Sequence, residues 1–216
     1  QRVRDALQAA EAAVGVLRSS PDAHRARCRA RMLALRVALI SPGELESPTD
    51  ACTALTRLLP GQAASWSSAI SEAALESNIA CQRGRDDGPA LARAEALIAA
   101  ADAAGVEPAG LVAAQVQVLI SKVQRDADLG RNPASWIAEA EALLRPGAGN
   151  EDFDRLAIRH QLDLVTALYG EPDERRLAAA RAAATAERLV ALSPEVPSLH
   201  NRLGSALYTL AFEQLE

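Results

Sequence analysis

The chain has 216 residues, of which 49% are hydrophobic and 24% charged, proportions that are typical of a globular protein. Alanine supplies 48 residues and leucine 29, against 12 valines, 7 isoleucines and 6 aromatic residues, so the composition favours helix and excludes a predominantly β fold. The net charge of -5 argues against a nucleic-acid partner, and the sequence has no apolar run long enough for a membrane-spanning helix.

Proline positions divide the chain into helices of similar length. Two interleaved series of prolines recur at spacings of 38 to 48 residues, and proline belongs in the first turn of a helix or just after its end. In chain order, the pattern predicts ten helices in five antiparallel hairpins: 2–19 with 21–40, 48–59 with 63–82, 89–104 with 108–129, 133–145 with 150–169, and 172–192 with 197–215. We therefore expect an all-α fold in which stacked hairpins form a single repeat domain over residues 1–216.

Capping signals mark several of these helix starts. Ser20, Pro21 and Asp22 supply an N-cap, a first-turn proline and an acidic first turn for the second helix. Asn132 and Pro133 begin the seventh helix in a similar way. The alanine run at 178–184 predicts a flat face against which a neighbouring helix packs closely.

The second predicted helix carries a cluster of arginines. Its members lie within twelve residues, and on a helix they cover more than half of the circumference: Arg25, Arg27, Arg29, Arg31 and Arg36. One interpretation is a basic patch for an acidic peptide, a phosphorylated segment or another part of the same chain. The alternative is a solvated helix face with ion pairs to acidic residues elsewhere.

The three cysteines are Cys28, Cys52 and Cys81. Their number is odd and none belongs to a C-x-x-C pair, so we expect free thiols rather than a disulfide framework or a zinc site. Free thiols are typical of a reducing compartment, and the first residues lack the apolar core of a signal peptide, so the sequence predicts a cytoplasmic location. The chain begins with glutamine and ends within a helical pattern, and we expect it to be a fragment of a longer protein.

The sequence contains no motif for nucleotide binding, zinc proteolysis or a nucleophilic serine. The three histidines lie on three different predicted hairpins: His24, His160 and His200. Acidic pairs and triplets precede predicted helix starts, where capping explains them: Asp86 with Asp87, and Glu151 with Asp152 and Asp154. We therefore expect no catalytic residue, no metal site and no cofactor, and we do not expect an enzyme.

The last part of the chain resembles the tetratricopeptide repeat family. Residues 189–194 (LVALSP) are similar to the end of one repeat, and four residues fall where the next repeat has a large residue, a Leu-Gly pair and an aromatic: His200, Leu203, Gly204 and Leu207. Trp66 lies six residues after Pro60 and matches the same large-residue position. The family unit has about 34 residues, so the longer spacing here marks the repeats as degenerate and tetratricopeptide-like. Residues 189–216 also resemble helical repeats attached to bacterial serine/threonine kinases and signalling ATPase regulators; the excess of arginine over lysine is typical of a GC-rich bacterial genome.

The resemblance implies a right-handed α-solenoid of about five hairpins, with partner peptides in a concave groove. The residues that it places in the groove are Arg25, Ser67, Ser71, Gln115, Lys122, Ser198, Asn201, Ser205 and Tyr208. The function that it implies is a non-catalytic module or scaffold for a peptide or protein domain. The alternative is an intramolecular regulatory arm or spacer of a larger bacterial signalling protein such as a serine/threonine kinase. The ends of the array could also support self-association, and the groove residues could equally be a solvated surface.

Overall fold

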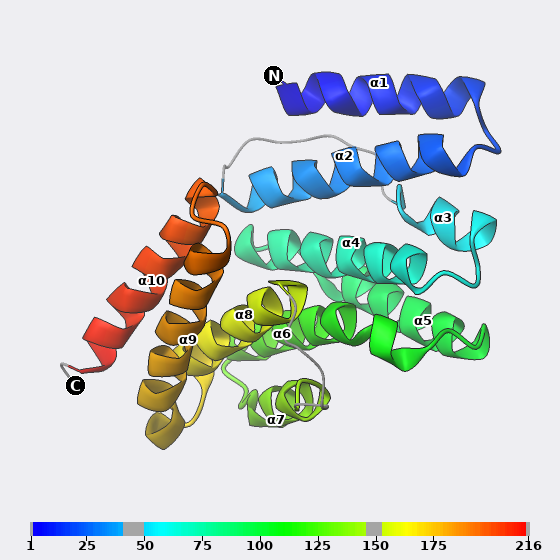
Figure 1. Ribbon diagram of the computed structural model, residues 1–216. Helices are drawn as coiled ribbons and strands as arrows, with labels where there is room; N and C mark the ends of the chain where they lie inside the picture. Colours follow the sequence, from blue (N-terminus) through cyan, green and yellow to red (C-terminus); the bar gives the residue numbers. More distant parts are fainter. Residues whose placement is uncertain (1, 41–49, 146–152, 215–216) are drawn as a thin grey trace. The chain divides into compact units, whose positions relative to one another are not determined.

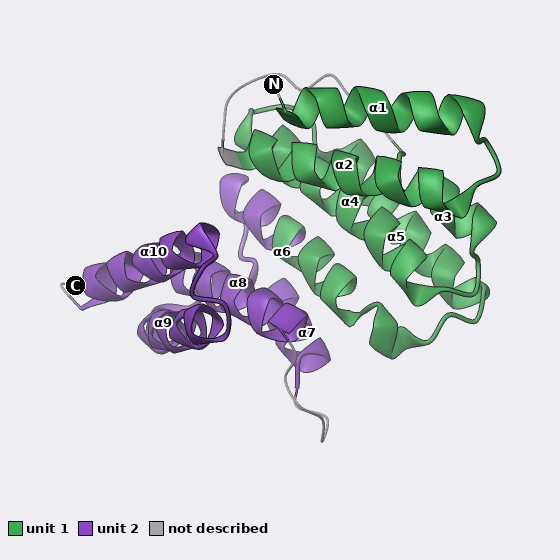
Figure 2. Ribbon diagram, turned by 45° about the horizontal axis from the view of Figure 1, so that its top comes forward, with its two compact units in different colours: residues 1–121 green, residues 122–216 purple. Residues whose placement is uncertain are grey.

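The computed structural model describes residues 2–40, 50–145 and 153–214, and in these ranges it contains ten α-helices, one short 3-10 helix and no strand (Figure 1). The all-α fold predicted from the composition is thereby confirmed. The chain divides into two compact units, residues 1–121 and residues 122–216 (Figure 2). The boundary falls within one helix, and each unit is described by itself.

The first unit contains five complete helices, the 3-10 helix and the first part of a sixth helix. Their bounds are α1 (Arg2–Val16), α2 (Pro21–Ile40), α3 (Thr53–Leu58), α4 (Ala63–Gln82), α5 (Gly88–Ala103), η1 (Pro108–Gly110) and α6 (Val112–Asp128). Helices α1, α2 and α4 lie side by side in that order, and α4 also packs on α3 and α5 (Figure 1). The predicted pairs α1 with α2 and α3 with α4 are therefore neighbours in space.

Helix α4 is the centre of the first unit. Eleven of its 20 residues are buried, so α4 is covered by other elements around most of its circumference. Trp66 and Ile70 of α4 share one core cluster with Leu91 and Leu97 of α5 and with Val118 of α6. Six alanines from α4, α5 and α6 belong to the same cluster and allow the helix axes to approach closely.

The second unit contains the rest of α6 and four more helices. Their bounds are α7 (Ala134–Leu143), α8 (Phe153–Tyr169), α9 (Pro172–Leu192) and α10 (Pro197–Glu213). Helix α8 packs on α7 and α9, and α10 packs on α9 and α8. The alanine run predicted to form a flat face does so, because Ala178 and Ala179 pack against Ala167 of α8, and Ala182 packs against Ala206 of α10.

The observed helix ends follow the predicted signals closely. The Ser20 hydroxyl accepts a hydrogen bond from the backbone N–H of Ala23 at 3.4 Å, and the Asn132 side chain accepts one from Ala134 at 2.8 Å. Gly84 follows α4 in the left-handed conformation, with φ of 62°. The largest differences are α3, which has only six residues, and the 3-10 turn ahead of α6. The predicted starts at 48 and 150 and the predicted end at 215 lie outside the described residues.

Candidate interaction site

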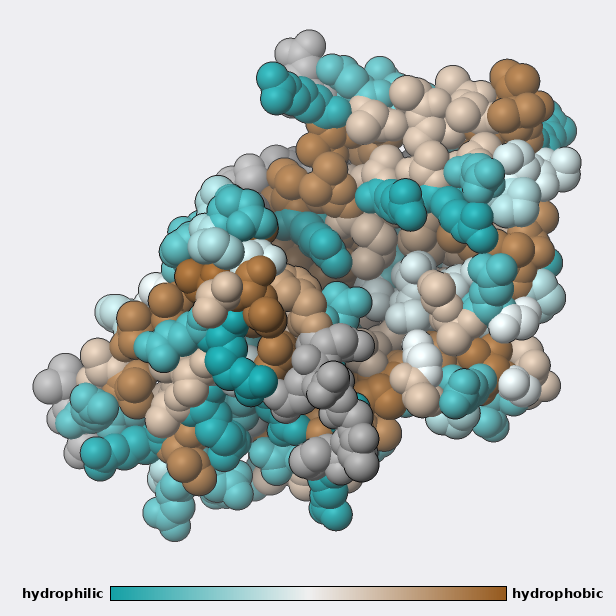
Figure 3. Space-filling view, viewed as in Figure 1, coloured by the Kyte–Doolittle hydropathy of each residue, from teal (hydrophilic) through white to brown (hydrophobic). Residues whose placement is uncertain are grey.

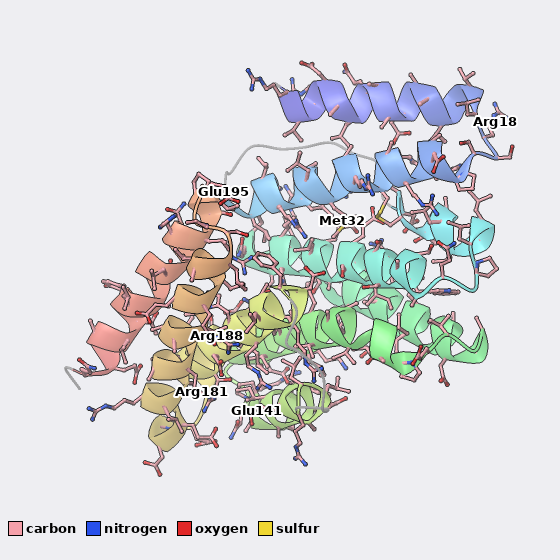
Figure 4. The ribbon with its side chains drawn as sticks, in the orientation of Figure 1. Arg18, Met32, Glu141, Arg181, Arg188 and Glu195 are labelled. Carbon is pink, nitrogen blue, oxygen red and sulfur yellow. A yellow bond between two sulfur atoms is a disulfide. The ribbon has the colours of Figure 1, made fainter. Side chains whose placement is uncertain are left out.

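Three ring side chains close the turn before their helix in the same way. In each case a ring nitrogen donates to the backbone carbonyl six residues earlier in the chain: His24 to Arg18 at 2.9 Å, Trp66 to Pro60 at 2.8 Å and His200 to Pro194 at 2.8 Å. The resemblance aligned Trp66 with His200, and these two residues make the same hydrogen bond. His24 belongs to the same set, which sequence reasoning missed because residue 18 is not a proline; Figure 4 labels Arg18 at this turn.

The five arginines of α2 do not form one exposed patch. Arg25 binds Asp22 at 2.8 Å and Arg27 binds Glu11 of α1 at 2.6 Å, whereas Arg31 is buried in the interior of the first unit. Only Arg29 and Arg36 of the five are mostly exposed. This arrangement matches the alternative of a helix face with ion pairs more closely than it matches a binding patch, since exposed pairs of this kind lower the local positive potential.

Arg31 belongs to a buried ionic cluster between α2, α4 and α5. Its Nη2 donates to Glu76 at 2.6 Å, and its Nε lies 3.4 Å from the carboxylate of Glu72. Glu76 also accepts a hydrogen bond from Arg93 of α5. The cluster thus joins three helices through charges that are balanced within the protein, and its role is to hold the fold.

Glu72 is 1% exposed and anchors the segment that precedes α3. Its two carboxylate oxygens accept hydrogen bonds from the backbone N–H groups of Ala51 at 3.1 Å and Cys52 at 2.9 Å. Burial raises the pKa of Glu72 above its ordinary value of 4.5, while the backbone hydrogen bonds and Arg31 act in the opposite direction. Glu72 therefore supplies α3 with an N-terminal cap from another helix.

The expectation of three free cysteines is wrong. Cys28 of α2 and Cys52 form a disulfide across 24 positions of the chain, and Cys81 is not part of a disulfide. The two Cα atoms are 4.6 Å apart, within the range that a disulfide spans, and Glu72 of α4 binds the backbone N–H of Cys52 beside the bond. The sequence did not indicate this pairing, because the cysteine count is odd and no short spacing motif is present. The two cysteines come together only in the tertiary structure.

Removing this disulfide should destabilise the first unit. We expect the double substitution Cys28→Ala and Cys52→Ala to lower the free energy of unfolding by about 3 kcal/mol, because the bond restricts the unfolded chain. Urea denaturation followed by circular dichroism measures the loss, and Cys81→Ala is the control, with an expected change below about 1 kcal/mol. Equal losses in the two proteins would contradict a stabilising role for the disulfide.

The predicted groove residues before α10 are only partly accessible. Ser67 and Ser71 on α4 and Gln115 on α6 are half-buried. Lys122 of α6 lies over the ring of Trp136, with 4.3 Å between its Nζ and the ring centroid. Trp136 in turn donates to Asp126 at 2.7 Å. Lys122 and Trp136 therefore take part in contacts between helices, and the half-buried residues offer only part of their surface to a partner.

On α10 all four residues of the predicted stripe are exposed. Ser198, Asn201, Ser205 and Tyr208 all face away from the core, where Leu199 and Ala206 are buried. Two more apolar side chains of α10 are exposed beside them, and the fractions are 74% for Tyr208, 52% for Phe212 and 45% for Leu207. Figure 3 shows brown, hydrophobic patches at the lower left, where Figure 1 places α10. Sequence reasoning identified Tyr208 and missed Phe212. An apolar side chain can be recognised as solvent-facing only when it is known which neighbouring residues of the helix are buried.

The second unit also buries two titratable side chains of α8. His160 donates from Nδ1 to the carbonyl of Ala182 at 3.0 Å, and Asp163 accepts from Arg181 of α9 at 2.9 Å. Arg181 lies 3.5 Å from Glu141 of α7 as well, and Figure 4 labels both residues. Burial lowers the pKa of His160 below its ordinary value of 6.5 and raises the pKa of Asp163 above 3.8. These groups join α7, α8 and α9 and lie away from the exposed face of α10.

The buried histidine makes the second unit sensitive to acid. The folded chain binds the His160 proton less readily than the unfolded chain, so the free energy of unfolding should fall as the pH falls below 6.5. We expect His160→Gln to lose most of the decrease between pH 6.5 and pH 5, and His200→Gln, at an exposed position, to retain it. Thermal unfolding at a series of pH values measures the effect, and identical pH profiles for the two variants would contradict it.

The titratable side chains and the cavity of the described residues bear on whether the chain holds a ligand or metal site. The described residues contain no group of three histidine, cysteine or acidic side chains that could bind a metal ion. A cavity of about 150 Å³ lies between α2 and α4, beside Arg31, Glu76 and Arg83, and it is smaller than the sites that usually hold a small-molecule ligand. Asp87 is buried and accepts from Ser77, while Glu151 and Asp152 lie outside the described residues.

Comparison with known proteins adds no further assignment. No family model, no curated protein and no solved structure matches the chain. Within the described ranges, no helix is both long enough and apolar enough to cross a membrane. The exposed face of α10 is therefore the feature on which a functional proposal can be built.

Proposed function

We propose that the chain is a non-catalytic protein-interaction module, built of tetratricopeptide-like hairpins and binding its partner through the exposed face of α10. The observation that carries the proposal is the cluster of Tyr208, Phe212 and Leu207, which are large apolar side chains left in solvent on one helix. Aromatic side chains are enriched where proteins bind one another. A partner that covers them gains the free energy of removing this surface from water.

The proposal includes a right-handed solenoid in which successive hairpins stack. Two observations support it. The two helices of four predicted hairpins pack on each other (α1 with α2, α3 with α4, α7 with α8 and α9 with α10), and the ring-to-carbonyl hydrogen bond recurs at the start of α2, α4 and α10. Repeats that share a turn and its closing side chain are the expected remnant of a repeated unit.

The chemistry of α10 favours an uncharged partner surface over the acidic peptide considered for α2. From position 203 to position 212, α10 carries no charged residue. Binding through this face should persist at high salt, whereas binding through the arginines of α2 should weaken as salt screens the charges. The alternative function, an intramolecular arm of a bacterial signalling protein such as a serine/threonine kinase, requires little binding by the isolated chain.

The disulfide bears on where the module works. Buried disulfides persist in oxidising environments, such as the bacterial periplasm or the cell exterior, and are rare in the cytosol. The Cys28–Cys52 bond therefore argues against the cytoplasmic location expected from the sequence, and we propose an oxidising compartment instead. Alkylation of source-cell extracts without reductant tests the proposed oxidising compartment. Labelling of Cys28 would show a free thiol in the native protein and would contradict that location.

Affinity capture from source-cell extract tests the interaction function. We expect the wild-type chain to retain a protein at both low and high salt, and Tyr208→Glu to lose it. Ala184→Glu adds the same charge at an exposed position of α9 and serves as the matched control. Equal retention by Tyr208→Glu and Ala184→Glu, or retention only at low salt, would contradict binding through α10.

A further inference from the structure

We propose that the cavity between α2 and α4 binds a small organic anion, a monocarboxylate with an apolar body of about six carbon atoms. All of the residues that line the cavity belong to the first unit, and none belongs to α10. The proposal therefore adds a ligand to the interaction module, and it does not depend on which partner α10 binds.

The apolar part of the lining sets the size of the ligand. Leu35 and Ala38 of α2 and Ile79 of α4 line the cavity, and Leu35 and Ile79 also belong to one core cluster. The cavity has a volume of about 150 Å³, at which an apolar protein cavity holds a molecule of the size of benzene. A nucleotide or a sugar chain exceeds this volume, whereas a single ring or a short branched chain fits.

A buried arginine supplies a donor for the anionic group. Arg31 lines the cavity and is only 5% exposed. Its Nη2 donates to Glu76 at 2.6 Å and its Nε lies 3.4 Å from the carboxylate of Glu72, while its Nη1 makes no hydrogen bond with any residue that the structure describes. Hydrogen bonds between charged groups gain strength away from water, so a carboxylate in the cavity provides a favourable acceptor for Nη1.

The charges of the lining favour an anion over a cation. Arg83 and Arg85 line the cavity together with Arg31, and the acidic residue among the described lining residues is Glu76. Both carboxylate oxygens of Glu76 accept hydrogen bonds from arginines, one from Arg31 and the other from Arg93 of α5, so Glu76 is poorly placed to bind a cation. Phosphate would leave the apolar lining uncovered, and a neutral ring would offer no charged acceptor to Nη1. A carboxylate on a small apolar body matches both parts of the lining.

The end of α4 brings the last of these arginines to the cavity. Gly84 follows the helix in the left-handed conformation, and the backbone N–H of Arg85 donates to the carbonyl of Ala80 at 2.8 Å. The chain therefore turns back along the last turn of α4, and Arg85 lies beside Ala80, which also lines the cavity.

Titration calorimetry with benzoate tests the proposal, with benzamide as a neutral probe of the same shape and phosphate as an inorganic anion. We expect benzoate to bind with a dissociation constant of about 0.1–1 mM, and benzamide and phosphate to bind at least about tenfold more weakly. No binding of benzoate below about 10 mM, or equal binding of benzamide or of phosphate, would overturn the proposal.

Two substitutions test whether benzoate occupies this cavity. Ala38→Leu fills the apolar part of the lining, and Ala30→Leu is its matched control, at another half-buried position of α2 outside the lining. Arg85→Gln removes an exposed charge of the lining, and Arg36→Gln removes an exposed charge outside it. We expect Ala38→Leu to weaken benzoate binding at least about tenfold and Arg85→Gln about threefold, with both controls unchanged.

Circular dichroism checks that all four variants fold, and the binding comparison is made among those that do. Benzoate binding that neither Ala38→Leu nor Arg85→Gln weakens, or that the controls weaken equally, would overturn the assignment to this cavity. Neither variant changes α10, so capture of a protein through α10 should persist in both, and the ligand and the interaction function stand or fall separately.

Discussion

Replacing Glu72 by alanine should lower the free energy of unfolding by about 3–5 kcal/mol, because the substitution leaves a buried charge without its partner. Arg31 is 5% exposed and would keep only Glu76 as a counter-charge. The backbone N–H groups of Ala51 and Cys52 would also lose their acceptor in a buried site. The segment before α3 would lose its anchor on α4, although the Cys28–Cys52 bond would still tether it to α2.

Urea denaturation of the oxidised protein measures this effect. Glu95→Ala is the matched control, since Glu95 is an exposed glutamate on α5, and its removal should cost less than about 1 kcal/mol. The loss of unfolding free energy for Glu72→Gln should lie between the losses for Glu72→Ala and Glu95→Ala, because the amide retains one acceptor oxygen and loses the charge. A loss below about 1 kcal/mol for Glu72→Ala would show that the ionic cluster contributes little to the fold.

Truncation of Trp66 to alanine should also cost about 3–5 kcal/mol. The side chain is 8% exposed, packs in the largest cluster of the first unit and donates to the Pro60 carbonyl. The substitution therefore creates a cavity and leaves a carbonyl without its donor. Trp66→Phe separates the two contributions, because it retains most of the packing and removes the hydrogen bond, whose loss should cost about 1 kcal/mol.

The three residues that close turns provide the comparison for this prediction. His200 makes the same hydrogen bond as Trp66 but is exposed, so His200→Ala should cost less than about 1.5 kcal/mol. Chemical denaturation of Trp66→Ala, Trp66→Phe and His200→Ala gives the series. If Trp66→Ala cost no more than His200→Ala, burial at this position would not matter and the repeat alignment through Trp66 would lose its support.

The helices were predictable because their signals are local. Proline fixes the backbone of the first turn, and Ser20 and Asn132 satisfy N–H groups within their own helix, so residues close in sequence determine where α2 and α7 begin. The alanine run at 178–184 predicted close packing, because a small side chain allows a neighbouring helix to approach closely whichever helix that is. The bounds of α9, Pro172–Leu192, match the predicted range at both ends.

The disulfide, the buried ionic cluster and the length of α3 were not predictable, because they depend on residues that meet only in the folded chain. Cys28 and Cys52 are 24 positions apart, and the backbone of Cys52 is bound by Glu72, which lies a further 20 residues along the chain. Arg31 looked like one member of a basic patch because its partners, Glu72 and Glu76, are on another helix. The length of α3 could not be predicted for the same reason, since Glu72 of α4 binds the two residues that directly precede it.

The candidate site was predictable in part. The family resemblance placed Tyr208, Ser205 and Asn201 on one face of the last helix, and this face is exposed. It gave no reason to include Phe212, because an aromatic residue in a helix is ordinarily a core residue. Only the burial of Leu199 and Ala206 on the opposite side identifies Phe212 as part of an apolar surface.

Amide hydrogen exchange of the wild-type chain, compared with and without the protein that it captures from source-cell extract, tests most directly whether α10 is the binding face. It needs no substitution and reports every helix at once. We expect exchange across residues 197–213 to slow when the captured protein is present, while α2 and α4 stay unchanged. An α10 that exchanges at the same rate in both samples, or slowing that is confined to the arginine-bearing part of α2, would contradict binding through the α10 face.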